Sequence, residues 1–229
     1  FMEQQALYDL GLGKAEAEKN SLAVQRMQTP LGVYHCPSRR RPGLRAASVT
    51  FRNATNPVKL NAKIDYASNA GTYQQKDVTG PTTLTAAETY NWGSDLAKFT
   101  GIAYQRSEVT VAEVRDGTSN TIMVGEKYLR PDAYESSTLS AGDDEGVFVG
   151  SNFDSIRFVT LTNGTTVERP LQDQSGVEFD RKFGGSHSGS FNSVFCDGAV
   201  RSISYGIDTT VWIRLGNRQD GQPVDGSAF

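Results

Sequence analysis

The sequence contains few of the residues that carry redox, metal or nucleophilic chemistry. Its 229 residues include only two cysteines, two histidines and three methionines. Apolar runs are short, as at residues 121–125, so no segment of this sequence is expected to span a membrane. The net charge of −3 at pH 7 argues against a dedicated nucleic-acid-binding protein, because such proteins need an excess of positive charge.

Motifs of the common enzyme classes are also missing. The sequence has no glycine-rich phosphate loop and no dinucleotide-binding fingerprint. Ser186, His187 and Asp197 lie close together in the chain, but the serine is not part of a nucleophile elbow. A nucleophilic cysteine–histidine pair would need a third group to orient it, and the sequence marks none. We therefore predict that the protein is not an enzyme.

Small polar residues are abundant instead. Gly, Ser, Thr and Asn make up about a third of the chain, which is typical of strands and loops joined by many turns. No linker or internal repeat divides the chain, so we predict one domain over residues 1–229. Within it, residues 1–28 form the end of a helical region and residues 31–229 form a sheet with loops. Helices are expected at 2–10, 14–27 and 209–215. Strands or extended segments are expected at 31–36, 47–52, 63–73, 120–128, 147–149, 156–162, 165–168, 191–196 and 199–205, and residues 108–115 are expected as a short helix or strand.

Local turn and cap signals are strongest in the last third of the chain. Asp197-Gly198 between two apolar runs predicts a β-hairpin with a type I′ turn, and Asn163-Gly164 predicts a second hairpin. Asp208 is placed to cap the last helix, and Gly216 follows its end. Trp212 and Leu215 are three residues apart and are expected on the buried side of that helix.

The two cysteines, Cys36 and Cys196, allow two interpretations. Both lie in segments that resemble strands, so they are either small core residues or the two halves of a disulfide. A zinc site that adds His35 and His187 is disfavoured, because neighbouring residues on a strand point to opposite faces and His35 and Cys36 would not converge on one metal.

Two charged segments are candidates for ion binding. Calcium prefers six to eight oxygen ligands, and an acidic loop with polar residues downstream offers them, although without EF-hand spacing. The alternative is a solvated acidic loop. The run of arginines at 38–42 is expected as a solvated basic turn. The calcium candidates are Asp143, Asp144, Glu145, Asn152 and Asp154.

Four motifs in order carry a family resemblance. The first is Tyr-His-Cys-Pro-Ser at 34–38, and the last is His187 followed after nine residues by Asp197-Gly198. Together they resemble the planctomycete-type family of pilin-like proteins named for the H-x9-D-G motif, also known as a domain of unknown function. The two middle motifs, at 65–72 and 116–126, contain Asp65, Tyr66, Asn69 and Gly71, and Asp116, Gly117, Ser119, Asn120 and Glu126.

The resemblance implies an α+β pilin-like head with an antiparallel sheet. Family members begin with a prepilin-type leader and a long apolar helix, which holds the subunit in the inner membrane before assembly and packs in the filament afterwards. This sequence begins at Phe1 without either, so we expect upstream sequence to precede it. The implied protein is an exported structural subunit of a type IV pilin- or pseudopilin-like filament, at the envelope or outside the cell.

The same resemblance implies partners and residue roles. The subunit would form homo-oligomers and touch a membrane only through the upstream helix, and export favours a Cys36–Cys196 disulfide. The alternative function is an exported module that binds a glycan or calcium through the loops at 74–100 and 129–146.

The motif residues are expected to have scaffold roles. His187 would hold the loop at 184–186, and Asp197-Gly198 would form the hairpin turn. Asp116 and Ser119 would make turn and capping bonds before the strand at 120–128. Glu126 lies in an apolar strand, so it would need a partner such as an arginine if it is buried.

Overall fold

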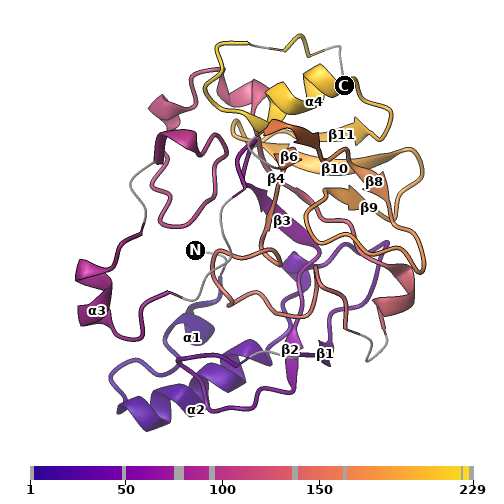
Figure 1. The fold of residues 1–229 in the computed structure, drawn as a ribbon. Helices are drawn as coiled ribbons and strands as arrows, with labels where there is room; N and C mark the ends of the chain where they lie inside the picture. The colour runs from indigo at the N-terminus through magenta and orange to yellow at the C-terminus, as the bar shows by residue number, and fades with distance from the viewer. Residues whose placement is uncertain are drawn as a thin grey trace.

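The computed structural model has an α+β fold (Figure 1). It describes residues 3–47, 50–74, 80–92, 96–135, 139–161, 164–222 and 224–226. The helices are α1 (Gln5–Tyr8), α2 (Glu16–Met27), α3 (Leu84–Thr89) and α4 (Thr209–Gly216). The strands are β1 (Leu44–Ala46), β2 (Leu60–Ala62), β3 (Tyr66–Asn69), β4 (Ile122–Glu126), β5 (Ile156–Arg157), β6 (Thr160–Leu161), β7 (Thr166–Val167), β8 (Leu171–Gln172), β9 (Gly184–Gly185), β10 (Ser190–Phe195) and β11 (Val200–Ser204).

The main sheet has five strands in the order β11-β10-β4-β3-β5. The first four strands pair with one another in antiparallel fashion, and β5 pairs in parallel with β3. Residues on β10 alternate between buried and half-buried positions, as expected for a strand with one face on the core. The smaller pairs β1–β2, β6–β7 and β8–β9 lie outside this sheet.

The predicted hairpin around Asp197-Gly198 is confirmed as β10–β11. The predicted turn type is wrong. Of the two central residues only Gly198 has a positive φ, of +85°, whereas a type I′ turn needs positive φ at both. The N–H of Phe195 donates to the carbonyl of Ala199 and the N–H of Gly198 donates back to Phe195, both at 2.9 Å. The loop is therefore three residues long, with glycine in the left-handed position.

Helix α4 closes the core with the predicted cap and buried side, although Gly216 is its last residue rather than the residue after its end. The carboxylate of Asp208 accepts hydrogen bonds from the backbone N–H groups of Thr210 and Val211, so it is the N-cap. Trp212 and Leu215 are fully buried. The indole ring of Trp212 packs edge-on against the rings of Phe183 and Phe191 at 5.7 and 6.0 Å, and its N–H donates to the carbonyl of Glu168 at 2.9 Å. This apolar cluster anchors the sheet from which the motif residues project.

The N-terminal helices lie at the opposite end of the molecule from α4 (Figure 1). Helix α2 confirms the helix expected at 14–27, whereas only residues 5–8 of the first expected segment are helical. Neither helix contains a fully buried residue. The guanidinium of Arg26 donates to the carbonyls of Leu7 and Leu10, which holds the two segments together.

Several weaker predictions differ from the structure. The segments at 31–36 and 108–115 contain short 3-10 turns, Gly32–Tyr34 and Val111–Glu113, and residues 147–149 form a turn. The β6–β7 pairing supports the hairpin at 163–164, but Asn163 itself lies outside the described residues. Part of the strand expected at 47–52 also lies outside them. Every helix in the described part of the chain is too short or too polar to cross a membrane.

Candidate functional site

Cys36, Glu126 and His187 meet at one end of strand β4. Their ligand-type atoms, Sγ, a carboxylate oxygen and a ring nitrogen, all lie within 4.8 Å of one another. His187 Nε2 is 3.6 Å from Cys36 Sγ and 3.2 Å from Glu126 Oε1. Cys36 and Glu126 are buried, while the His187 side chain is 31% exposed. We call this group the Cys–Glu–His cluster.

Backbone contacts place the three side chains. The N–H of Cys36 donates to Asp65 Oδ2 at 2.9 Å, which brings the loop after the first 3-10 turn against β3. The second carboxylate oxygen of Glu126 accepts the backbone N–H of Asn192 at 2.7 Å. The Tyr205 hydroxyl donates to the carbonyl of His187 at 3.2 Å, which anchors the loop between β9 and β10. Glu126 is buried and has partners, as expected, but these are His187 and this N–H rather than an arginine.

The cluster does not resemble an activated nucleophile. Burial and, to a smaller extent, the neighbouring Glu126 carboxylate together raise the pKa of the Cys36 thiol to about 11, so at neutral pH the sulfur keeps its proton. The same ring nitrogen of His187 faces both Cys36 and Glu126. In a catalytic relay the two ring nitrogens would contact different partners.

The Ser186–His187–Asp197 grouping is not assembled either. His187 precedes β10 and Asp197 follows it, and six residues of extended strand separate the two ends by roughly 20 Å. Asp197 instead stabilises its own turn: its carboxylate accepts the N–H of Ala199 at 2.9 Å and pairs with Arg201 at 3.2 Å.

Asp65 is the centre of a buried charge network. Its carboxylate is 2.7 Å from the Arg40 guanidinium, and its carbonyl accepts a hydrogen bond from Arg39 at 3.1 Å. Arg39 also pairs with Asp173 at 3.0 Å. Both arginine side chains are almost fully buried. The segment at 38–42, predicted as a solvated basic turn, is therefore built into the core through two of its arginines.

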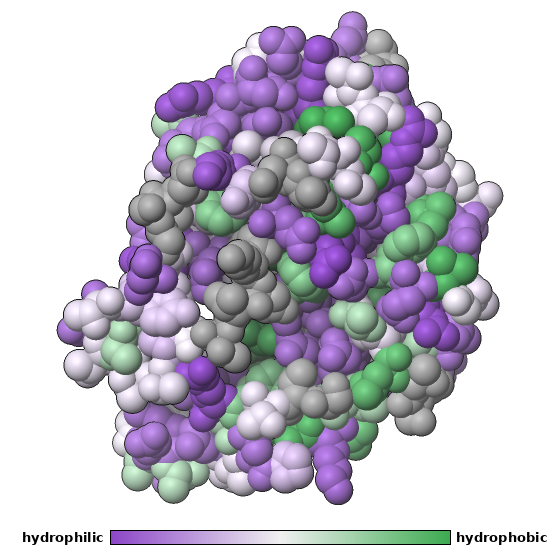
Figure 2. Space-filling view, viewed as in Figure 1, coloured by the Kyte–Doolittle hydropathy of each residue, from purple (hydrophilic) through white to green (hydrophobic). Residues whose placement is uncertain are grey.

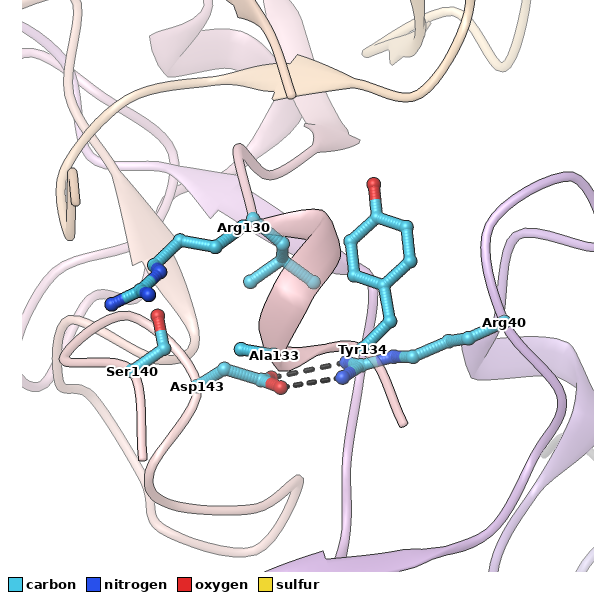
Figure 3. A pocket seen from close by; sticks show the side chains of 7 residues that line it. Arg40, Arg130, Ala133, Tyr134, Ser140 and Asp143 are labelled. Atoms are coloured by element: carbon cyan, nitrogen blue, oxygen red, sulfur yellow. Dashed lines mark hydrogen bonds and ion pairs between the residues drawn. The ribbon is translucent and has the colours of Figure 1, made fainter. Parts of the chain in front are cut away.

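The acidic loop that holds the calcium candidates is neither solvated at Asp143 nor open there, because basic side chains of the same chain occupy that position. Asp143 pairs with Arg40, at 2.5 and 3.1 Å, and with Lys127 at 3.1 Å, and Figure 3 shows the Arg40 and Asp143 side chains facing each other. Although burial alone would raise the pKa of Asp143, the charges of Arg40 and Lys127 outweigh it and hold the pKa below its usual range. The surrounding depression, lined also by Tyr134 and Ser140, leaves no room for a water-sized molecule.

The other calcium candidates also face this network. The ammonium of Lys127 lies 3.8 Å from the carboxylate of buried Asp154, and that of Lys63 donates to the carbonyl of Glu145 at 3.1 Å. Asn152 donates its amide to the Glu145 carboxylate. Asp144, half-buried, follows Asp143 in the same loop. Since Asp143 already pairs with Arg40 and Lys127, and Asp154 lies beside the same lysine, the geometry opposes calcium binding by these candidates.

The motif around Asp116 holds the C-terminal segment. The buried Asp116 carboxylate accepts the backbone N–H groups of Asp220 and Gly221 at 2.7 and 2.8 Å, so it does not cap the following strand as predicted. Gly117 has φ +100° and precedes the 3-10 turn Thr118–Asn120. Asn120 donates its amide to the Asp116 carbonyl at 2.9 Å, and the Ser119 carbonyl accepts a hydrogen bond from Arg201.

The motif at 65–72 joins the sheet to α4. The buried amide of Asn69 donates to the carbonyls of Ile122 and Gly216, both at 2.9 Å, and accepts the N–H of Gly71 at 2.9 Å. Gly71 has φ +83°, and a β-carbon there would overlap the backbone of Gly101. Tyr66 pairs in register with Glu126 at the end of β4 that carries the cluster.

Cys36 and Cys196 are free thiols, so the predicted disulfide is wrong. Cys36 lies beside Glu126, whereas the N–H of Cys196 donates to the carbonyl of Thr121 at 2.9 Å. Thr121 and Glu126 are separated by five residues of extended chain, roughly 16 Å. A disulfide needs α-carbons within about 7 Å of each other.

Sequence reasoning missed the Cys–Glu–His cluster because each residue had a separate local interpretation. One signal was present: the motifs at 34–38, 116–126 and 187–198 contribute one residue each. Motifs far apart in a chain that each contain a metal- or proton-binding side chain are candidates for a shared site.

Comparison with known proteins gives one match. The family model described as "Protein of unknown function (DUF1559)" matches residues 1–210, a range that includes all four motifs. No curated protein and no solved structure gives a significant match to the chain.

Proposed function

The chain belongs to the family described as "Protein of unknown function (DUF1559)", and on that premise we propose that it is the globular head of a pilin- or pseudopilin-like structural subunit. The subunit assembles with copies of itself into a filament at the cell envelope or outside the cell. It carries no catalytic activity and binds no nucleic acid.

The observation that carries this proposal is how the motif side chains are used. Asp65, Asn69 and Asp116 direct their polar atoms to backbone and side chains of the same chain, and Asp197 does the same in its turn. They tie the N-terminal loops, the sheet, α4 and the C-terminal segment into one unit. A family whose characteristic residues build a rigid head is well suited to an assembly role.

The N-terminal end of the molecule offers a surface for assembly. Tyr8 and Leu12 are 78% and 73% exposed there, beside a groove of about 490 Å³ between α1 and α2. Elsewhere the face in Figure 2 is largely polar, with apolar residues in small separate groups. Exposed large apolar side chains beside a groove are typical of interaction surfaces. The resemblance to pilin-like proteins implies an upstream apolar helix entering from this end.

Electron microscopy of the full-length encoded protein tests the proposal. Coexpressed with a prepilin peptidase, it is expected to be cleaved and to yield filaments in the fraction sheared from cells. A processed protein that stays strictly monomeric, without filament or secretion partner, would refute the proposal. A glycan array on the same protein tests the alternative binding module, and strong binding without filaments would favour it.

A pair of variants tests whether the surface beside the groove between α1 and α2 is used in filament assembly. Leu12→Asp is expected to reduce filament yield without changing the melting temperature of the head. Val111→Asp is the matched control, because Val111 is 76% exposed but lies in the 3-10 turn Val111–Glu113, away from the groove. Equal yields from the two variants would exclude this end as the assembly surface.

A further inference from the structure

Three different metal-binding atom types converge in the Cys–Glu–His cluster. A thiol sulfur, an imidazole nitrogen and a carboxylate oxygen approach each other from three separate segments: the loop at 35–40, the end of β4 and the loop between β9 and β10. Two of the three residues are buried, so water does not separate these atoms as it does in surface clusters.

Two of the three separations in the cluster agree with those of a tetrahedral zinc site, and the third is within 4.8 Å. Typical zinc bonds of about 2.3 Å to sulfur and about 2.0 Å to nitrogen and oxygen put sulfur and nitrogen roughly 3.5 Å apart, and nitrogen and oxygen roughly 3.3 Å apart. The Cys36 Sγ–His187 Nε2 and His187 Nε2–Glu126 Oε1 distances are 3.6 and 3.2 Å.

Hydrogen bonding at His187 Nε2 does not serve all the polar neighbours of this nitrogen at once. His187 Nε2 has three polar neighbours, Cys36 Sγ, Glu126 Oε1 and, at 3.4 Å, the amide nitrogen of Asn192. One ring nitrogen either donates a single proton or accepts one hydrogen bond. It therefore serves only one of its neighbours at a time, whereas an ion placed among the sulfur, the nitrogen and the oxygen would bind all three at once.

We propose that Cys36, Glu126 and His187 bind one Zn²⁺ ion, with the fourth position open to solvent beside His187. A thiolate with an imidazole and a carboxylate suits zinc, whereas calcium and magnesium prefer oxygen alone. On binding, the Cys36 thiol releases its proton to solvent, and the imidazole carries its proton on Nδ1 so that the Nε2 lone pair faces the metal.

The ion would cross-link three segments that are far apart in sequence. It would tie the loop at 35–40, which includes the two buried arginines, to β4. It would also tie this loop to the one between β9 and β10, which contains the histidine of the H-x9-D-G motif. This function is independent of filament assembly, so the two proposals stand or fall by different measurements.

Calorimetric titration of zinc into the chelator-treated chain of residues 1–229 tests the proposal. One equivalent is expected to bind and to raise the melting temperature. Cys36→Ser and His187→Gln are each expected to weaken binding at least about tenfold, since even outer-shell changes at metal sites have effects of this size. Absence of zinc binding to the unmodified chain would overturn the proposal.

Matched variants distinguish this site from adventitious binding. Cys196→Ser and His35→Gln remove the other cysteine and the other histidine, and neither residue belongs to the cluster. Both variants are expected to bind zinc with unchanged affinity. If they weaken binding as much as Cys36→Ser and His187→Gln do, the ion is bound elsewhere and the proposal fails.

A measurement on the unmodified protein does not depend on how the variants fold. Cobalt(II) in the site is expected to give a thiolate-to-cobalt charge-transfer band together with the intense visible bands of tetrahedral cobalt. Bound cobalt with only the weak bands of an octahedral oxygen site would show that Cys36 is not a ligand and would overturn the assignment.

Discussion

Arg40 and Asp143 form a buried bidentate ion pair that joins two segments about a hundred residues apart in the chain. The guanidinium nitrogens lie 2.5 and 3.1 Å from the two carboxylate oxygens (Figure 3). Lys127 lies 3.1 Å from the same carboxylate, and Asp65 lies 2.7 Å from the same guanidinium. The pair thus belongs to a charge network in which each member compensates another in a region with little water.

Asp143→Asn should destabilise the head strongly. It leaves Arg40 and Lys127 with less compensating charge inside the protein, and breaking a buried pair from one side costs about 3–5 kcal/mol. The free energy of unfolding from urea titration measures the effect. Glu18→Gln is the control, since it breaks the exposed Lys14–Glu18 pair, worth about 0.3–0.5 kcal/mol. Similar losses in the two variants would contradict the buried network.

Gly71→Ala and Gly198→Ala should differ although both glycines have positive φ, +83° and +85°. At Gly198 nothing lies near an added β-carbon, so only the left-handed conformation is penalised, by about 1–2 kcal/mol. At Gly71 the β-carbon would also overlap the backbone of Gly101, and a loss of about 4 kcal/mol or more is expected. Chemical denaturation measures the loss of unfolding free energy in each variant. A larger loss for Gly198→Ala than for Gly71→Ala would refute the prediction.

Asp154 should make the head less stable as the pH rises from about 4 to about 7. Burial raises its pKa to about 7 in the folded chain, despite the opposing charge of Lys127, while an unfolded aspartate titrates near 3.9. In this window the folded chain keeps a proton that the unfolded chain has released. The free energy of unfolding therefore falls with pH, by at most about 1.4 kcal/mol per unit from this group.

Asp154→Asn should remove that contribution. Urea titrations of both proteins across the window are expected to show the variant gaining stability relative to the unmodified protein as the pH rises. A difference that stays constant with pH, or that changes in the other direction, would show that Asp154 ionises normally in the folded state.

Protein isolated without reductant should contain two free thiols. Cys36 and Cys196 lie near opposite ends of β4, too far apart to bond without rearranging the sheet. Denaturation in the presence of a thiol reagent should label both cysteines, and intact mass should show two additions per chain. An unlabelled chain that becomes labelled only after reduction would contradict this arrangement of the cysteines.

Elements with local signals could be predicted from the sequence. The β10–β11 hairpin follows from Asp197-Gly198, and α4 follows from Asp208 as its cap and from the spacing of Trp212 and Leu215. These features rest on hydrogen bonds and side-chain spacing within a few residues. Even there the exact turn was not predictable, because its three-residue loop also depends on the contact between Cys196 and Thr121.

Which polar side chains are buried together depends on long-range packing. Arg39 and Arg40 look like a solvated turn in the sequence, but Asp65 and Asp173 approach them from distant segments and make burial possible. The same long-range packing separates Cys36 from Cys196 and brings it to Glu126 and His187. Burial and charge compensation depend on contacts between residues 25 to 151 positions apart, which no local pattern encodes.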